Sequence, residues 1–260
     1  MFKIILARLQ QGHRTMKYPK GPAPKLSDRF QGLPKLSAVN CIAGCDACVK
    51  ICPTGAITVK ENHPCLDMGK CLFCGECANA CPQQIFTFSD DYHLAAHQRQ
   101  DMFILNNQQT QPGVTMAKDL KKILGRSLKL RQVSAGGCNA CEADTNVLNT
   151  LAWDLGRFGI QFVASPRHAD GLLITGPVTQ NMLLALKKTY DAVPEPKIVI
   201  AVGACAISGG PYIDHKQVKN GADTIVPVDL YIPGCPPNPL TILDGLIRFL
   251  GRKTTDKTKA

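Results

Sequence analysis

Cysteines are the residues of this 260-residue sequence with the clearest potential for chemistry, because the chain contains 13 of them in an otherwise ordinary composition. Disulfide frameworks are typical of small secreted domains, whereas this chain is long and its first residues do not resemble a signal peptide. Thiolates also bind zinc and iron–sulfur clusters. We therefore expect most of these cysteines to be metal or cluster ligands.

Eight of the cysteines lie in two consecutive groups. The first group reads CIAGCDACVKICP (41–53) and the second reads CLFCGECANACP (71–82). The second has the C-x2-C-x2-C-x3-C-P spacing of bacterial ferredoxins, and the first has one additional residue between its first two cysteines. Three cysteines of each group match at an offset of 29 residues, which predicts two half-domains related by approximate two-fold symmetry.

The spacing predicts which cysteines share a cluster. Three closely spaced thiolates can wrap around one cubane, while the fourth is directed away by proline and reaches the other cluster. The predicted ligands are Cys41, Cys45, Cys48 and Cys81 for one 4Fe–4S cluster, and Cys71, Cys74, Cys77 and Cys52 for the other. Zinc is the alternative, but paired C-x2-C zinc sites lack this triple spacing followed by Cys-Pro.

Four further cysteines follow predicted strands in the second half of the chain. Cys138 and Cys141 form a C-x2-C pair, Cys205 lies in VGACA, and Cys235 lies in PGCPP. Ligands of parallel α/β sheets bind beyond the carboxyl ends of the strands, so one sheet edge can gather these four residues. The alternative is a thioredoxin-like pair at 138 and 141, with the other two cysteines buried in the core.

The elements that position these cysteines alternate between strands and helices, which predicts a parallel α/β sheet. The expected strands are 127–133, 160–164, 171–176, 197–203 and one near 231–232, and the expected helices are 143–157, one opened by Thr179, and 239–250. Upstream, the polar and aperiodic stretch 89–114 predicts a linker. Thr115 is expected to cap a short helix that ends at Leu124, with Leu120, Ile123 and Leu124 on one face.

The first cysteine region resembles two-cluster ferredoxins. Together with GHRTMKYP near the N-terminus, it resembles the ferredoxin-like subunit shared by complex I and membrane-bound hydrogenases. The second half resembles the small subunit of nickel–iron hydrogenases and the homologous complex I subunit over nearly all of 126–250. Complex I members carry adjacent cysteines at the first position. Here Asn139 and Ala140 separate them, as in membrane-bound (group 4) hydrogenases.

The resemblance implies roles for several residues. Cys138, Cys141, Cys205 and Cys235 would hold a third 4Fe–4S cluster, which leaves Cys65 as a buried or free thiol. Arg167 matches a family arginine, and a cation near the cluster would favour its reduced state. The alternative for Arg167 is a salt bridge within its loop. Glu142 matches a family acid that could assist proton movement, but an acid in a first helical turn is more often a dipole partner.

The predicted fold class is an N-terminal α+β two-cluster ferredoxin-like domain followed by a C-terminal flavodoxin-like parallel α/β sheet. The expected organisation is a basic arm with an amphipathic helix (1–36), the ferredoxin-like domain (37–90), a linker with a short helix (91–125), the hydrogenase-small-subunit-like domain (126–251) and a basic tail (252–260). The arm places Phe2, Ile5, Leu6 and Leu9 on one helical face. The resemblance implies that it lies against a membrane partner, and an ordinary capping helix is the alternative.

The implied function is electron transfer within a membrane-associated hydrogenase complex. The net charge of +10 is concentrated in the arm, the linker and the tail, but no nucleic-acid-binding motif accompanies it, so we expect no nucleic acid partner. The resemblance implies a hydrogenase-type large subunit, membrane-embedded subunits, and a soluble ferredoxin or other donor as partners, at the cytoplasmic face of the membrane. Two alternatives remain: a related complex without nickel that reduces a quinone or another acceptor, and a redox-sensing or nucleic-acid-binding iron–sulfur protein.

Overall fold

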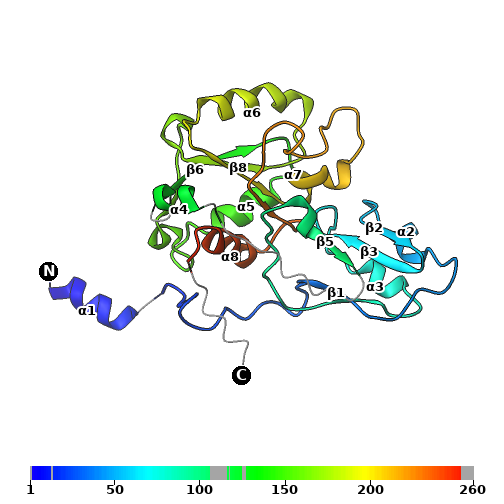
Figure 1. The fold of residues 1–260 in the computed structure, drawn as a ribbon. Helices are drawn as coiled ribbons and strands as arrows, with labels where there is room; N and C mark the ends of the chain where they lie inside the picture. The colour runs from blue at the N-terminus through cyan, green and yellow to red at the C-terminus, as the bar shows by residue number, and fades with distance from the viewer. Residues whose placement is uncertain (1, 13, 106–115, 117, 125–126, 253–260) are drawn as a thin grey trace.

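The computed structural model describes residues 2–12, 14–105, 116, 118–124 and 127–252. These residues form two adjoining lobes with separate sheets, and helix α1 (Phe2–Gln11) extends away from both (Figure 1). Within these ranges, no helix is long and apolar enough to cross a membrane. None of the side chains of α1 is buried, which agrees with its isolated position.

The N-terminal lobe repeats one helix–strand unit. Helix α2 (Ala47–Ile51) and strand β2 (Ile57–Lys60) are followed at an offset of 29 residues by helix α3 (Glu76–Ala80) and strand β4 (Phe86–Phe88). The remaining strands are β1 (Pro34–Leu36), β3 (His63–Asp67) and β5 (Phe103–Leu105). Strand β1 pairs with β4, and β3 pairs with both β2 and β5, all in antiparallel orientation. The predicted internal repeat of a ferredoxin-like fold is therefore confirmed.

Part of the stretch expected to be a linker forms secondary structure and packs between the two lobes. Residues 99–105 form the short 3-10 helix η1 (Arg99–Met102) and strand β5, whose Ile104 is buried. Just before them, Ala96 forms an antiparallel bridge with Tyr231 of the second sheet. The expectation of an aperiodic linker was wrong here, because a three-residue strand is too short to show a periodic pattern.

The C-terminal lobe contains a five-stranded parallel sheet in the order β10-β9-β8-β6-β7. Its strands are β6 (Leu128–Ser134), β7 (Ile160–Phe162), β8 (Gly171–Thr175), β9 (Ile198–Val202) and β10 (Leu230–Ile232). Counted from β6, this is the flavodoxin-like order 2-1-3-4-5 read from the β7 edge. The predicted flavodoxin-like sheet is therefore confirmed, and its switch point lies between β6 and β8.

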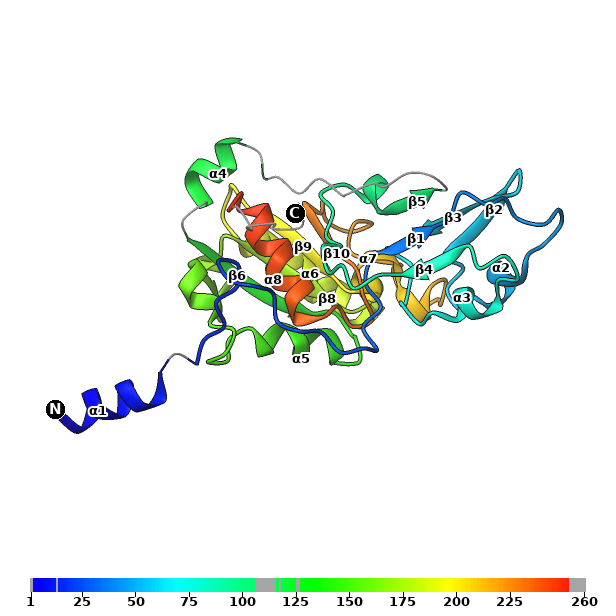
Figure 2. The same ribbon diagram turned by 90° about the horizontal axis from the view of Figure 1, so that it is seen from below.

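Helices cover both faces of this sheet. The helices are α4 (Lys118–Leu124), α5 (Ala140–Val147), α6 (Gln180–Ala192), α7 (Ala204–Ser208) and α8 (Pro239–Phe249). Helix α6 lies on one face, and α5 and α8 lie on the other (Figures 1 and 2). Successive strand residues point to opposite faces. Leu173 therefore packs in the α8 core, whereas its neighbours Leu172 and Ile174 pack in the α6 core.

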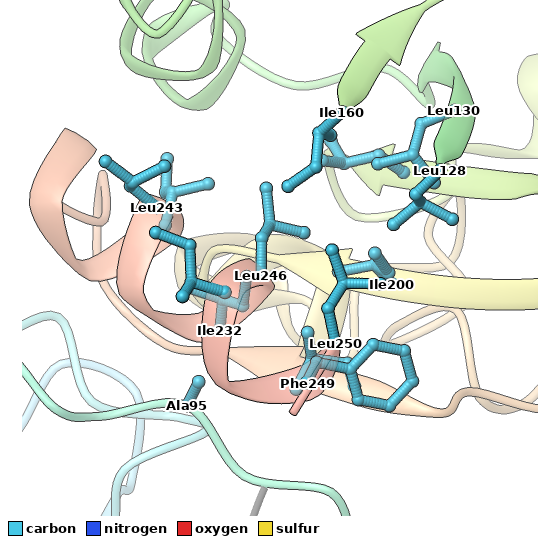
Figure 3. Close-up of a cluster of buried hydrophobic side chains, with 14 of the residues drawn as sticks. Ala95, Leu128, Leu130, Ile160, Ile200, Ile232, Leu243, Leu246, Phe249 and Leu250 are labelled. Carbon is cyan, nitrogen blue, oxygen red and sulfur yellow. The ribbon is translucent and has the colours of Figure 1, made fainter. Parts of the chain in front are cut away.

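The core under α8 is made largely of branched aliphatic side chains. Leu243, Leu246 and Leu250 face Ile200 and Ile232 of the sheet (Figure 3). Ala95, from the connection between the lobes, joins the same core. The C-terminal lobe and the segment that connects the lobes thus share one hydrophobic core.

Two helices differ from the sequence prediction. The helix expected over 143–157 begins earlier and ends at Val147, where Asn and Thr side chains compete with the helical backbone. Of the leucines in this stretch, Leu148 and Leu155 are buried, whereas Leu151 is exposed. In α4, Leu124 is buried but Ile123 is exposed, and Thr115 lies outside the described residues.

The packing predicts that Leu246→Ala lowers the free energy of unfolding by about 2–5 kcal/mol, since Leu246 is fully buried and truncation would leave a cavity. The matched control is Leu184→Ala in α6, where the side chain is 63% exposed. Its effect is expected to stay within about 0.5 kcal/mol. Denaturant-induced unfolding of both variants measures the difference, and equal destabilisation would contradict this core assignment.

Candidate metal centres

The first group of cysteines combines three residues of the first motif with one of the second. These residues are Cys41, Cys45, Cys48 and Cys81. Burial, followed by the neighbouring thiols of Cys81 and Cys45, raises the pKa of Cys41. Burial, with contributions from Cys41 and Cys81, raises the pKa of Cys48 to about 11. These mutual effects place the four thiols near one another.

The second group has the reciprocal composition. Cys52, Cys71, Cys74 and Cys77 line a single pocket, which also contains Phe88. Burial raises the pKa of Cys71 to about 12 although the Phe73 N–H lowers it, and Cys77, Cys52 and Cys74 contribute to the rise. The fourth cysteine of each motif therefore lies with three cysteines of the other motif. Crossed ligation requires this arrangement, and ligation itself stays a prediction.

The backbone around these two groups follows the same repeat. Helices α2 and α3 are followed at once by Cys52 and Cys81, whose backbones are extended. The N–H of Ala56 donates to Cys52 Sγ at 3.3 Å, and the N–H of Ile85 donates to Cys81 Sγ at 3.5 Å. Both donors lie four residues after their acceptor. Hydrogen bonds to sulfur are one of the means by which proteins tune cluster potentials.

The third group lies beyond the carboxyl edge of the parallel sheet. Cys138 and Cys141 follow β6, Cys205 is in α7 after β9, and Cys235 follows β10. Burial, with contributions from Cys235, Cys138 and Glu142, raises the pKa of Cys205 to about 12. Burial, with Cys205 as the largest charged contributor, also raises the pKa of Cys141. The structure therefore brings all four thiols together, as the sheet-edge argument expected.

Exposure within the third group is uneven. Cys141 and Cys205 are buried, whereas Cys138 and Cys235 are exposed. Asn139, one of the two spacer residues, has a left-handed backbone with φ of 71° directly before α5. This conformation separates the exposed cysteine of the C-x2-C pair from the buried one. One side of the group therefore faces the interior, and the other side is exposed.

Glycine makes room for the sulfurs of this group. A Cβ at Gly203, whose φ is +90°, would lie 2.5 Å from Cys141 Sγ. A Cβ at Gly210 would lie 2.9 Å from Cys205 Sγ. Each sulfur therefore lies against bare backbone, which only glycine permits at this distance. This close approach fits a cofactor that both sulfurs would bind.

The donor chemistry also fits an iron–sulfur cluster. Buried thiols with raised pKa values keep their protons unless a cation replaces them, so cluster binding would displace protons. Among the residues that the structure describes, no three His, Cys, Asp or Glu side chains are arranged to hold a single metal ion. Zinc needs its thiolates at about 2.3 Å, whereas a cubane spreads four thiolates over four iron atoms.

Glu142 lies at the switch point of the sheet. Its Oε1 accepts hydrogen bonds from Ser134 Oγ at 2.6 Å and from Thr175 Oγ1 at 2.7 Å, at the ends of β6 and β8. The side chain is buried next to Cys141. Glu142 is therefore a buried, hydrogen-bonded acid, and not a solvent-exposed one that interacts only with the dipole of α5. A role in proton movement stays a prediction.

Two other residues singled out from the sequence lie outside the three cysteine groups. Arg167 is exposed in the short 3-10 helix η3 (Pro166–His168) after β7 and forms no ion pair with the described residues. Cys65 is half-buried in β3, and burial followed by Asp67 raises its pKa. Tuning by Arg167 stays a prediction. Cys65 is not grouped with the other cysteines.

The glycine cradle predicts a site-specific effect of Gly203→Ala. The new methyl group would displace Cys141 Sγ, so we expect loss of about four irons per chain, the content of one cubane. Gly12→Ala is the matched control, because Gly12 also has a positive φ, has no atom within 4 Å of the added Cβ and lies outside the cysteine motifs. Iron analysis of both variants measures the effect. An unchanged iron content in Gly203→Ala would contradict the role of Gly203 in giving space to Cys141 Sγ.

Comparison with known proteins agrees with this arrangement. Residues 138–249 match the family described as NADH ubiquinone oxidoreductase, 20 Kd subunit, and residues 40–85 match the 4Fe-4S dicluster domain. The chain is 44% identical over 131 residues to the probable membrane-bound hydrogenase subunit mbhJ of Pyrococcus furiosus. That alignment covers 50% of this chain and 78% of the relative.

Two further relatives match over similar lengths. Formate hydrogenlyase subunit 7 of Escherichia coli is 46% identical over 137 residues, which cover 53% of this chain and 54% of the relative. An NADH-quinone oxidoreductase subunit of Clostridium beijerinckii is 47% identical over 112 residues, or 43% of this chain and 66% of the relative. With its sheet, its cysteine groups and these matches, the chain belongs to the family of the 20 kDa subunit of NADH ubiquinone oxidoreductase and carries a 4Fe–4S dicluster domain before it.

Proposed function

We propose that this chain is the iron–sulfur electron-transfer subunit of a membrane-associated, energy-converting nickel–iron hydrogenase complex. It would relay electrons through three 4Fe–4S clusters to or from the active site of a partner large subunit. The observation that carries this proposal is the convergence of twelve cysteines in three groups of four, two in the N-terminal lobe and one at the sheet edge. Each cluster, when bound, supplies a one-electron carrier.

The residues of this chain hold and tune these carriers. The proposed ligand sets are Cys41, Cys45, Cys48 and Cys81; Cys71, Cys74, Cys77 and Cys52; and Cys138, Cys141, Cys205 and Cys235. The N–H groups of Ala56 and Ile85 donate to two of these sulfurs, and Gly203 gives space to a third. This chain would therefore set the distances between the clusters and their reduction potentials, and the hydrogen chemistry would take place on the partner subunit.

The packing between the lobes supports an electron relay. Cys71 and Cys77 belong to the same buried core as Ala206 and Ile207, which lie in α7 next to Cys205. The second and third cysteine groups are thus separated by tightly packed protein and not by solvent. Beyond the third group, the exposed Cys138 and Cys235 support contact with a large subunit at this edge of the sheet.

The arm supports a peripheral position at the membrane. Helix α1 exposes Phe2 (80%), Leu9 (75%) and other apolar side chains. The first 36 residues carry eight Lys and Arg against one Asp. The apolar face of the helix would pack against membrane-embedded subunits. The basic residues would lie at the cytoplasmic surface of the membrane, where anionic lipids attract positive charge. A soluble ferredoxin or another donor would exchange electrons with the N-terminal lobe.

A second candidate function is electron transfer in a complex I-like or hydrogenase-related complex without nickel, which would reduce a quinone or another acceptor. The match to the 20 kDa subunit of NADH ubiquinone oxidoreductase favours it. The spacer residues Asn139 and Ala140 favour the hydrogenase, as do the relatives from a membrane-bound hydrogenase and a formate hydrogenlyase.

The partner's metal content distinguishes the two functions. The complex that contains this chain is purified anaerobically, and nickel is counted relative to the chain. The proposal predicts nickel in the complex and reduction of the clusters by hydrogen, because the large subunit would carry the hydrogen chemistry. The hydrogenase would be contradicted, and the second candidate would remain, if the complex held no nickel and its large subunit lacked the two C-x2-C motifs that bind nickel in hydrogenase large subunits.

A further inference from the structure

The two lobes contact each other at a buried hydroxyl group. The side chain of Ser208, 5% exposed, places Oγ 3.0 Å from the carbonyl oxygen of Gly69 and 3.1 Å from that of Ala204. Since a hydroxyl has one proton, the two carbonyl groups share it. One carbonyl belongs to the N-terminal lobe and the other to α7, so this hydroxyl connects the lobes directly.

Gly69 is held rigidly on its own side of the contact. Its N–H donates to Asp67 Oδ1 at 2.9 Å, and Arg99 binds both carboxylate oxygens of Asp67, at 2.7 and 2.6 Å. Bidentate pairs of this kind fix geometry as well as charge. A Cβ at Gly69 would lie 2.8 Å from both Arg99 Cζ and Ile207 Cγ2. The lobes therefore approach each other as closely as a bare backbone allows.

Both sides of the contact lead directly to a cysteine group. Gly69 precedes Cys71 by two residues, and the N–H of Cys71 donates to the carbonyl of Asp67 at 3.1 Å. Ser208 follows Cys205 by three residues in the same short helix, α7. A change in the distance between Gly69 and Ser208 would therefore change the distance between the second and third cysteine groups.

We propose that Ser208 and Gly69 are positioning residues that set the spacing between the site of Cys71 and the site of Cys205. This inference rests on the proposed electron-transfer function. In the step concerned, one electron passes between the two sites, so that one is oxidised and the other is reduced by the same electron. No bond forms or breaks and no proton moves. Because electron transfer slows steeply with distance, a small separation of the lobes would slow it without changing any ligand.

The test uses two variants in the whole complex, Ser208→Ala and Gly69→Val. The first removes the shared hydroxyl, and the second inserts a side chain between Arg99 and Ile207. Ser89→Ala is the matched control, because its hydroxyl also donates to a carbonyl, that of Leu33 at 2.9 Å, but within the N-terminal lobe. Iron content, the magnetic interaction between the two reduced clusters, and the rate of electron transfer in a single turnover are measured.

Both variants are expected to keep the iron content of the wild type, with a weaker magnetic interaction and severalfold slower transfer, and Gly69→Val to show the larger effect. Ser89→Ala is expected to match the wild type. The inference would be overturned if both variants kept their full iron content and also showed an unchanged magnetic interaction and an unchanged rate of electron transfer. If Gly69→Val loses iron, Ser208→Ala alone decides. A wild-type chain without clusters would instead overturn the proposed function.

Discussion

The burial of thiols in groups of four is the constraint on which the rest of this structure depends. Burial raises the pKa of Cys71 and of Cys205 to about 12, and the neighbouring thiols of each group contribute. Four sulfurs at one point are therefore stable only as protonated thiols or as ligands of a cationic group. The chain binds its cofactors, on this account, by gathering thiols that a cluster deprotonates, so that cluster binding also stabilises the fold.

The two lobes meet this constraint in different ways. The N-terminal lobe has strands of only three to five residues. Its core includes the cysteines themselves, among them Cys48, Cys71, Cys77 and Cys81. Cluster binding would therefore add to the apolar packing of this lobe, which includes the fully buried Leu66, Met68 and Met102. The C-terminal lobe has an extensive aliphatic core under α8 and α6, so its sheet can position the third group from preformed strand ends.

Sequence reasoning succeeded where spacing carries the information. The offset of 29 residues predicted the two repeated half-domains of the N-terminal lobe, and the alternation of apolar segments predicted the parallel sheet. It failed where contacts join distant residues. Strand β5 is too short for a pattern, the bond from Thr175 to Glu142 spans 33 residues, and the bond from Ser208 to Gly69 spans 139. Such contacts depend on how elements that are distant in the sequence pack together, which local patterns do not encode.

The central claim is that each of the three cysteine groups holds one cubane. Iron and acid-labile sulfide analysis of the anaerobically purified complex tests this most directly, combined with electron paramagnetic resonance during a reductive titration. The account predicts about twelve irons per chain, from three clusters of four, and three reducible paramagnetic centres. About eight irons and two centres would contradict it, because the group formed by Cys138, Cys141, Cys205 and Cys235 would then hold no cluster.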